Sequence, residues 1–220
     1  MTIINRVEIE CCICGTKINH MDIGSTNTLG GSPDLDTRPP EMQRSTIQYW
    51  VQRCPSCGYC SPNLSESADG AEEIINLTEY QDILKNPDMP EIATSFMALS
   101  FEKQLQGKYS DAAWSAIHAA WICDDENHHE ASRLCREKAI QMIEKAHANS
   151  QVIAKQPGAS ESITIDLMRR AGMFQQALEF AESTKEKDIE KIIKHIIEYE
   201  IGLIKRKDID SHKISDALDG

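Results

Sequence analysis

The sequence predicts a mainly helical chain that begins with a small β-rich module held together by cysteines. Six of the eight cysteines lie within the first 60 residues, and apolar residues at helical spacing begin only after about Asp69. Residues 65–220 carry eighteen Lys or Arg and twenty-nine Asp or Glu, so they contribute −11 of the formal net charge of −12. We therefore predict a four-cysteine module over residues 1–66, a helical-hairpin domain over residues 67–210 and a flexible tail over residues 211–220.

Two short strands are expected in the first module, and each leads into a cysteine pair. Residues 7–10 alternate between apolar and acidic side chains up to Cys11, and residues 47–51 repeat the alternation before Cys54. Between the two pairs, residues 21–45 are rich in Gly, Ser, Pro and Asp and are expected to form a long loop.

Each expected strand is followed by the same element, C-x-x-C-G, at residues 11–15 and 54–58. Two thiolates three residues apart bind one tetrahedral ion only if the chain turns back sharply between them, and the glycine adopts the required left-handed conformation at little cost. Two such turns complete a four-cysteine zinc site of the zinc-ribbon type. The predicted zinc ligands are Cys11, Cys14, Cys54 and Cys57.

The other cysteines of the module leave alternatives open. Cys12 lies inside the first motif, and Cys60 forms a further C-x-x-C with Cys57 that is followed by Ser-Pro instead of Gly. Cys60 as a replacement ligand, a redox dithiol and unmetallated thiols are the alternatives. Four thiolates leave no open coordination position, so the zinc is expected to be structural and not catalytic. His20 is expected to be a surface histidine.

Two polar segments have both an ordinary and a functional interpretation. Asp34, Asp36 and Arg38 in the long loop fit an internally hydrogen-bonded loop with an Asp–Arg pair, or else a polar contact surface near the zinc. Residues 123–130, CDDENHHE, fit an acidic loop that caps the next helix, or else a site for a divalent metal. His118 lies within a predicted helix and is expected to pack there or to face solvent.

The second part of the chain predicts a series of helices separated by short breakers. The expected helical segments are residues 70–86, the two parts of 91–125 on either side of Gly107, and residues 128–149, 167–182 and 185–208. Two of the turns are alike, because Leu105, Gly107, Tyr109 and Ala112 recur in order as Met168, Gly172, Phe174 and Ala177.

The repeated turn favours helical hairpins. We expect its small glycine and its aromatic residue to let two antiparallel helices pack closely, which resembles the helix-turn-helix unit of tetratricopeptide repeats. The two centres lie about 65 residues apart instead of the 34 of that repeat, so a bundle with similar hairpins is the alternative.

Several segments together resemble a bacterial and archaeal family of unknown function that pairs two CxxC knuckles with helical, tetratricopeptide-like hairpins. They are SPDLDTRP, STIQYWVQRCPSCGY, RRAGMFQQALEFAE and IIEYEIGLIKRKD. The matching residues of the first module are Cys11, Cys14, Gly15, Asp34, Asp36, Pro39, Cys54, Pro55, Cys57, Gly58 and Tyr59. The resemblance implies zinc and a helical scaffold, and it supplies no activity. Cys12 and Cys60 go beyond the family pattern.

Composition narrows the classes of function. The first residues do not resemble a signal peptide and no apolar run is long enough to cross a bilayer, so we expect a cytoplasmic protein with reduced thiols and no membrane contact. The acidic balance disfavours a nucleic-acid binder, which needs a basic surface. The sequence contains no nucleophile–base arrangement, phosphate loop or dinucleotide fingerprint.

These exclusions favour a non-enzymatic role. We expect a zinc-binding adaptor or scaffold whose helical hairpins form a groove for a protein partner. The alternative is a thiol-based redox sensor or enzyme that uses Cys12 and Cys60 beside the zinc site. A nucleic-acid-binding zinc ribbon is the least favoured interpretation.

Overall fold

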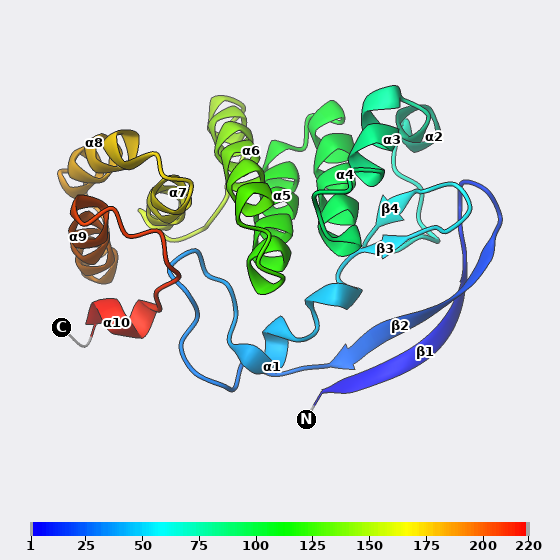
Figure 1. Cartoon of the computed structure of the whole chain (residues 1–220), viewed down its shortest axis with the longest axis horizontal. Helices are drawn as coiled ribbons and strands as arrows, with labels where there is room; N and C mark the ends of the chain where they lie inside the picture. The colour runs from blue at the N-terminus through cyan, green and yellow to red at the C-terminus, as the bar shows by residue number, and fades with distance from the viewer. Residues whose placement is uncertain (1, 219–220) are drawn as a thin grey trace.

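The computed structural model of the chain describes residues 2–218 and shows an arc of helices with the N-terminal region along its underside (Figure 1). The strands are β1 (Ile3–Glu10), β2 (Lys17–Ser25), β3 (Gln52–Arg53) and β4 (Cys60–Ser61). The short helices of the first part are α1 (Glu41–Arg44), the 3-10 helix η1 (Ile47–Tyr49), α2 (Ala71–Ile75) and α3 (Thr78–Leu84). The long helices are α4 (Glu91–Leu105), α5 (Tyr109–Asp125), α6 (His129–Ala148), α7 (Ala159–Arg170), α8 (Phe174–Lys185) and α9 (Lys191–Lys205), and α10 (Ile214–Leu218) ends the described chain.

The N-terminal region is built from two antiparallel β-hairpins, each with a cysteine motif at its turn. β1 and β2 pair from Glu10 opposite Lys17 to Ile3 opposite Ser25. β3 and β4 pair over two residues each. The chain is therefore mainly helical with a small antiparallel β region at its N-terminus, as the sequence predicts.

Two elements of this region differ from the sequence prediction. Residues 47–51 form η1 and the turn after it, and a strand begins only at Gln52. The neighbours Thr46 and Ile47 are both buried, and Tyr49 is only half-buried, so burial does not alternate as it would along a strand. The second half of β2 lies in the predicted long loop, because its pairing with β1 outweighs its own Gly, Ser and Asp content.

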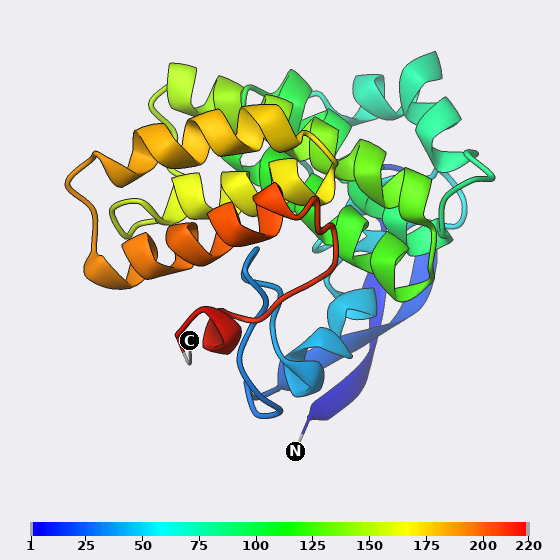
Figure 2. The same cartoon turned by 60° about the vertical axis from the view of Figure 1, so that its left-hand side comes forward.

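The middle of the arc is held by closely packed helices. α5 lies between α4 and α6, and its small side chains are fully buried against both. These residues are Ala112, Ala113, Ala116, Ala119 and Ala120. Small side chains at a helix interface let the axes approach, so α4, α5 and α6 form the main core. α7, α8 and α9 share a second, smaller core (Figure 2).

The two similar turns owe their glycines to backbone conformation. Gly107 has φ 71° and Gly172 has φ 76°, values that only glycine adopts without strain. A Cβ atom at either position would meet nothing within 4 Å. The expectation that these glycines allow close helix packing is therefore wrong, since the turn geometry alone requires them.

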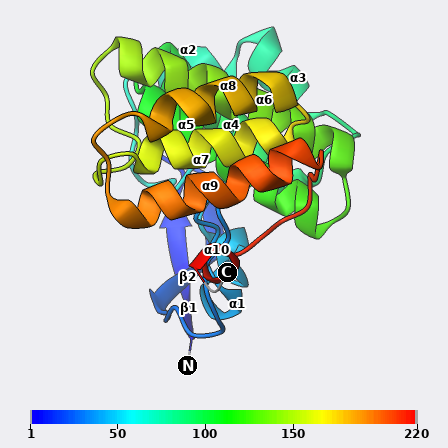
Figure 3. The ribbon, with the colours of Figure 1, turned by 90° about the vertical axis from the view of Figure 1, so that its left-hand side faces the viewer.

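The C-terminal segment folds back onto the loop that follows β2 (Figure 3). The backbone N–H of Leu35 donates to the carbonyl of His212 at 2.9 Å, and that of Ile214 donates to the carbonyl of Pro33 at 2.9 Å. The sequence predicts a flexible tail over residues 211–220. In the structure residues 211–218 contact the loop and include α10, and residues 219–220 lie outside the described part.

A buried arginine joins α7, α9 and the C-terminal segment. Arg169 is fully buried; its Nη2 donates to Asp166 at 2.6 Å and its Nε donates to Glu200 at 2.7 Å. Its Nη1 donates to the carbonyl oxygen of Asp208 at 2.7 Å. Because buried charges are tolerated only when paired, this cluster fixes how the three segments meet.

His118 joins the N-terminal region to the helical core. Its partly buried ring lies 5.1 Å from that of Trp50, which precedes β3, and 5.0 Å from that of Trp121 on α5. Phe96 on α4 lies 5.3 Å from it. Burial among these rings lowers the pKa of His118 to about 4. Within residues 2–218, no helix is both long enough and apolar enough to cross a lipid bilayer.

Replacing Arg169 with Leu should destabilise the protein strongly. The change leaves Asp166 and Glu200 buried without their cation, and the expected loss is about 3–5 kcal/mol in the free energy of unfolding. Urea denaturation followed by circular dichroism measures this loss. Arg206→Leu, at the exposed residue that follows α9, is the matched control and should cost less than about 0.5 kcal/mol. Equal losses in the two variants would contradict the role of the cluster.

The titration of His118 should weaken the fold in acid. In the unfolded chain the ring binds a proton near pH 6.5, whereas in the folded chain it does so only near pH 4. Stability is therefore lost as the pH falls through this window, by up to about 3 kcal/mol. Urea denaturation at pH 7, 6, 5 and 4 should show the free energy of unfolding of the wild type falling relative to that of His118→Leu. A difference that stays constant with pH would show that this histidine does not titrate as proposed.

Candidate metal centre

The two cysteine motifs form the same tight turn. The N–H of Gly15 donates to the carbonyl of Cys11 at 2.8 Å, and the N–H of Gly58 donates to that of Cys54 at 2.9 Å. Both glycines have positive φ, 71° and 79°. The left-handed conformation predicted from the C-x-x-C-G pattern is therefore present in both turns, and it directs each cysteine pair toward one point.

The turns bring four sulfur atoms together from two places in the chain. The Sγ atoms of Cys11, Cys14, Cys54 and Cys57 all lie within 4.8 Å of one another. Cys11 Sγ is 3.7 Å from Cys57 Sγ, and Cys14 Sγ is 3.6 Å from Cys54 Sγ. Four sulfurs at about 2.3 Å from a central tetrahedral ion would lie about 3.8 Å apart. The spacing therefore fits a metal site, and these are the four cysteines that the sequence singles out.

The environment of the sulfurs also fits a bound cation. Burial raises the pKa of Cys11 and Cys57, whereas hydrogen bonds with Thr16 lower the pKa of Cys14 to about 6. Neighbouring thiolates repel each other, and three of the four cysteines are shielded from water, since Cys11 and Cys54 are buried and Cys57 is half-buried. All four can therefore be ionised together only if a positive ion lies between them.

Hydrogen bonds fix both turns to the rest of the chain. The hydroxyl of Tyr80 on α3 accepts from the backbone N–H of Cys60 at 3.0 Å and donates to the carbonyl of Gly58 at 3.1 Å. The backbone N–H of Cys12 donates to the carbonyl of Leu64 at 2.9 Å. The candidate metal centre is thus braced against the first helices of the arc.

The remaining candidate residues of the module lie outside the four-sulfur group. Cys60 is fully buried and burial raises the pKa of its thiol to about 11, while desolvation also raises the pKa of the more exposed Cys12. Raised pKa values disfavour the thiolate that redox chemistry needs. His20 is partly buried on β2, and burial lowers the pKa of its ring.

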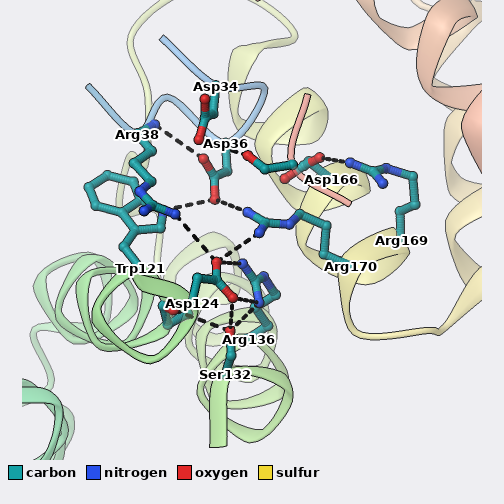
Figure 4. A network of polar contacts seen from close by, with 12 residues as sticks. Asp34, Asp36, Arg38, Trp121, Asp124, Ser132, Arg136, Asp166, Arg169 and Arg170 are labelled. Carbon is teal, nitrogen blue, oxygen red and sulfur yellow. Dashed lines mark hydrogen bonds and ion pairs between the residues drawn. The ribbon is translucent and has the colours of Figure 1, made fainter. Parts of the chain in front are cut away.

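The loop with Asp34, Asp36 and Arg38 docks on the helices (Figure 4). Asp36 is fully buried and accepts from Trp121 Nε1 at 2.8 Å and from Arg170 Nη1 at 3.2 Å. Its other oxygen accepts the backbone N–H of Arg38 at 3.1 Å. The Arg38 guanidinium pairs with Asp124 and Asp125 on α5, not with an aspartate of its own loop. The internal hydrogen bonds expected of this loop are present, whereas the charged partners of Arg38 lie on α5.

The segment CDDENHHE is mostly helical and takes part in the same network. Asp124 and Asp125 end α5 and α6 begins at His129, so residues 126–128 connect the two helices, close to the gap between the helical segments expected at 91–125 and 128–149. Asp124 accepts from Arg170 Nη2 at 2.7 Å and from Arg136. Although burial raises the pKa of Asp124, these two guanidiniums hold it below its usual value. The acidic residues therefore bind arginines of this chain.

Comparison with known proteins assigns the chain to a family. Residues 4–200 match the model of a family described as an uncharacterized protein conserved in bacteria (DUF2225). The chain belongs to this family. The match runs from β1 to α9, so the four-cysteine module and the helical arc are both part of the DUF2225 unit. No curated protein and no solved structure matches the chain.

Sequence reasoning singled out Arg38 but missed Arg136 and Arg170 of this DUF2225 chain. Arg136 lies on the face of α6 that also carries Ser132 and Ala139, all of them buried. Arg170 follows Ile163 and Leu167 on the buried stripe of α7, at spacings of seven and three residues. A charged residue on an otherwise buried helix face is the signal that marks both.

The four-sulfur group should hold one metal ion per chain. Elemental analysis of protein purified without chelators should find this ion in the wild type, and Cys14→Ser should lower the metal content several-fold because it removes one of four ligands. Cys12→Ser is the matched control, two residues away, and should keep the full content. Metal-free wild-type protein, or equal losses in the two variants, would show that the group is not the metal site.

Proposed function

We propose that this chain is a non-enzymatic zinc-binding interaction module that acts as an adaptor or scaffold. Zinc is the proposed ion because four thiolates in tetrahedral arrangement are its usual structural site. None of the eight cysteines, all of which lie in the described part of the chain, forms a disulfide, which supports a reducing compartment, and we place the protein in the cytoplasm.

The donor set supports a structural role for the zinc. Catalytic zinc keeps one position for water or substrate, whereas four protein thiolates fill the tetrahedron. The two turns also carry no chemistry of their own beyond binding. The proposed contribution of the metal is to fix β1 and β2 at their connected end and to hold them against the turn between β3 and β4.

The helical arc is the proposed scaffold, with hairpins of the tetratricopeptide type. Part of the surface that we expected to receive a partner is covered by the chain itself, since Leu35 and Asp36 of the N-terminal loop are buried against the helices. A partner must therefore bind elsewhere, and the free end of the β1–β2 hairpin is the best candidate.

The observation that carries this proposal is the exposed apolar end of the β1–β2 hairpin. Ile3 and Ile4 are 50% and 38% exposed and lie at the end away from the cysteine turn, and Met21, 39% exposed, lies opposite Arg6 in the middle of the hairpin. β2 lies beside η1, so β1 forms the outer edge (Figure 1). A two-stranded ribbon is marginally stable in water and an unpaired strand edge can bind a further strand. We propose a protein partner that adds a strand to β1.

A charge at the free end of the hairpin should abolish partner binding. The experiment is quantitative affinity purification of the tagged full-length protein from its native cells, with Ile4→Glu compared with the wild type. A partner captured by the wild type should fall at least about tenfold with the variant, because a buried charge opposes an apolar contact. Leu134→Glu changes a similarly exposed leucine on α6 and should leave capture unchanged.

Two further measurements, the metal content of the variants and the turnover of small substrates, decide the outcome. Both variants should keep the metal content of the wild type, which shows that the hairpin has remained anchored. Capture of the same proteins by Ile4→Glu would overturn the proposed surface, and turnover of a small substrate by the purified protein would overturn the non-enzymatic role.

A further inference from the structure

A cavity of about 500 Å³ lies where the N-terminal loop, the helices and the C-terminal segment meet. Four arginines line it: Arg38, Arg44, Arg136 and Arg170. The whole chain has nine arginines and a net charge of −12, so nearly half of its guanidinium groups are gathered at one cavity of an acidic protein. Such a concentration calls for a counter-charge.

The carboxylates of the network use only part of the hydrogen-bond donors of these arginines, and the buried Nε atoms of Arg38, Arg136 and Arg170 have no partner among the described residues. The direct partners of the four guanidiniums are Asp36, Asp124 and Asp125, one carboxylate fewer than there are arginines. Each guanidinium carries five N–H groups, so twenty donors face three carboxylates and one hydroxyl. Asp210 and Ser211 line the C-terminal side of the cavity, and the Ser211 hydroxyl donates to Asp34 at 2.8 Å. The four arginines therefore keep N–H groups that are free to donate to a bound anion.

A helix terminus adds to the positive side of the cavity. α6 is twenty residues long, and its first residue, His129, lines the cavity. The residue before it, His128, makes no side-chain capping bond. The first N–H groups of a helix carry a partial positive charge and bind anions readily. This terminus and the four arginines thus act on the same space.

We propose that this cavity binds a small phosphate-bearing anion. The planar fork of arginine matches the oxygens of phosphate in pairs, and the volume lies within the range of small-molecule sites. The lining comes from α1 and the loop before it, from α5, α6 and α7, and from residues 209–211. A bound anion would therefore hold three segments together and stabilise the folded chain.

Arg44 offers a test that leaves the fold in place. Its side chain is 34% exposed and its ion pair is with Asp125 alone. The affinities for pyrophosphate and for inorganic phosphate are measured by calorimetry at low salt, together with the thermal shift that each produces. Pyrophosphate should bind saturably to the wild type and raise its Tm, and Arg44→Gln should weaken binding about tenfold or more.

Arg133→Gln is the matched control. Arg133 lies on α6 and pairs with Glu130 and Glu137, away from the cavity. Arg133→Gln has the same net charge as Arg44→Gln, but it should bind pyrophosphate as the wild type does. The proposal is overturned if neither phosphate compound binds saturably at millimolar concentrations, if the two variants bind alike, or if citrate binds as well as pyrophosphate.

Discussion

Asp36 is the carboxylate on which the arrangement of the chain depends. It is fully buried, and a buried carboxylate is tolerated only when donors surround it. Its donors are Trp121 on α5, Arg170 on α7 and the backbone of its own loop. The loop can therefore occupy its place only when both helices are already in theirs. Arg38 and Arg44 extend the same contact to the end of α5, so the N-terminal loop is specified by polar groups more than by apolar area.

A second anchor lies at the other end of the N-terminal region. The four sulfurs join the two β-hairpins, Tyr80 ties the second turn to α3, and the aromatic cluster around His118 brings Trp50 onto α4 and α5. The main apolar core runs from Val51 and Tyr59 into the helices without a break. The four-cysteine region is consequently built into the arc, and only the free end of the β1–β2 hairpin extends beyond it.

The features that could be predicted from sequence are those with a local cause. The C-x-x-C-G turns follow from spacing and one glycine, and the long helices follow from periodicity with turns such as that at Gly107. The features that could not be predicted depend on distant partners. β2 becomes a strand because it pairs with β1. η1 forms where Ile47 and Val51 are buried in the main core. Trp121 and Arg170 lie 85 and 134 residues from Asp36, and no local pattern in the sequence links them.

The pairing of Leu35 with His212 sets an order on the events of synthesis. All four cysteines of the four-sulfur group lie within the first 57 residues to be synthesised. The two turns can therefore close early and hold a metal ion while translation continues. The loop between them must wait for α7 and then for residue 212, because its partners there are made last. During that interval the loop and the side chain of Asp36 stay in water. The nascent protein thus passes through a stage in which the four-cysteine end is folded while the loop that carries Asp36 has not yet docked on the helices.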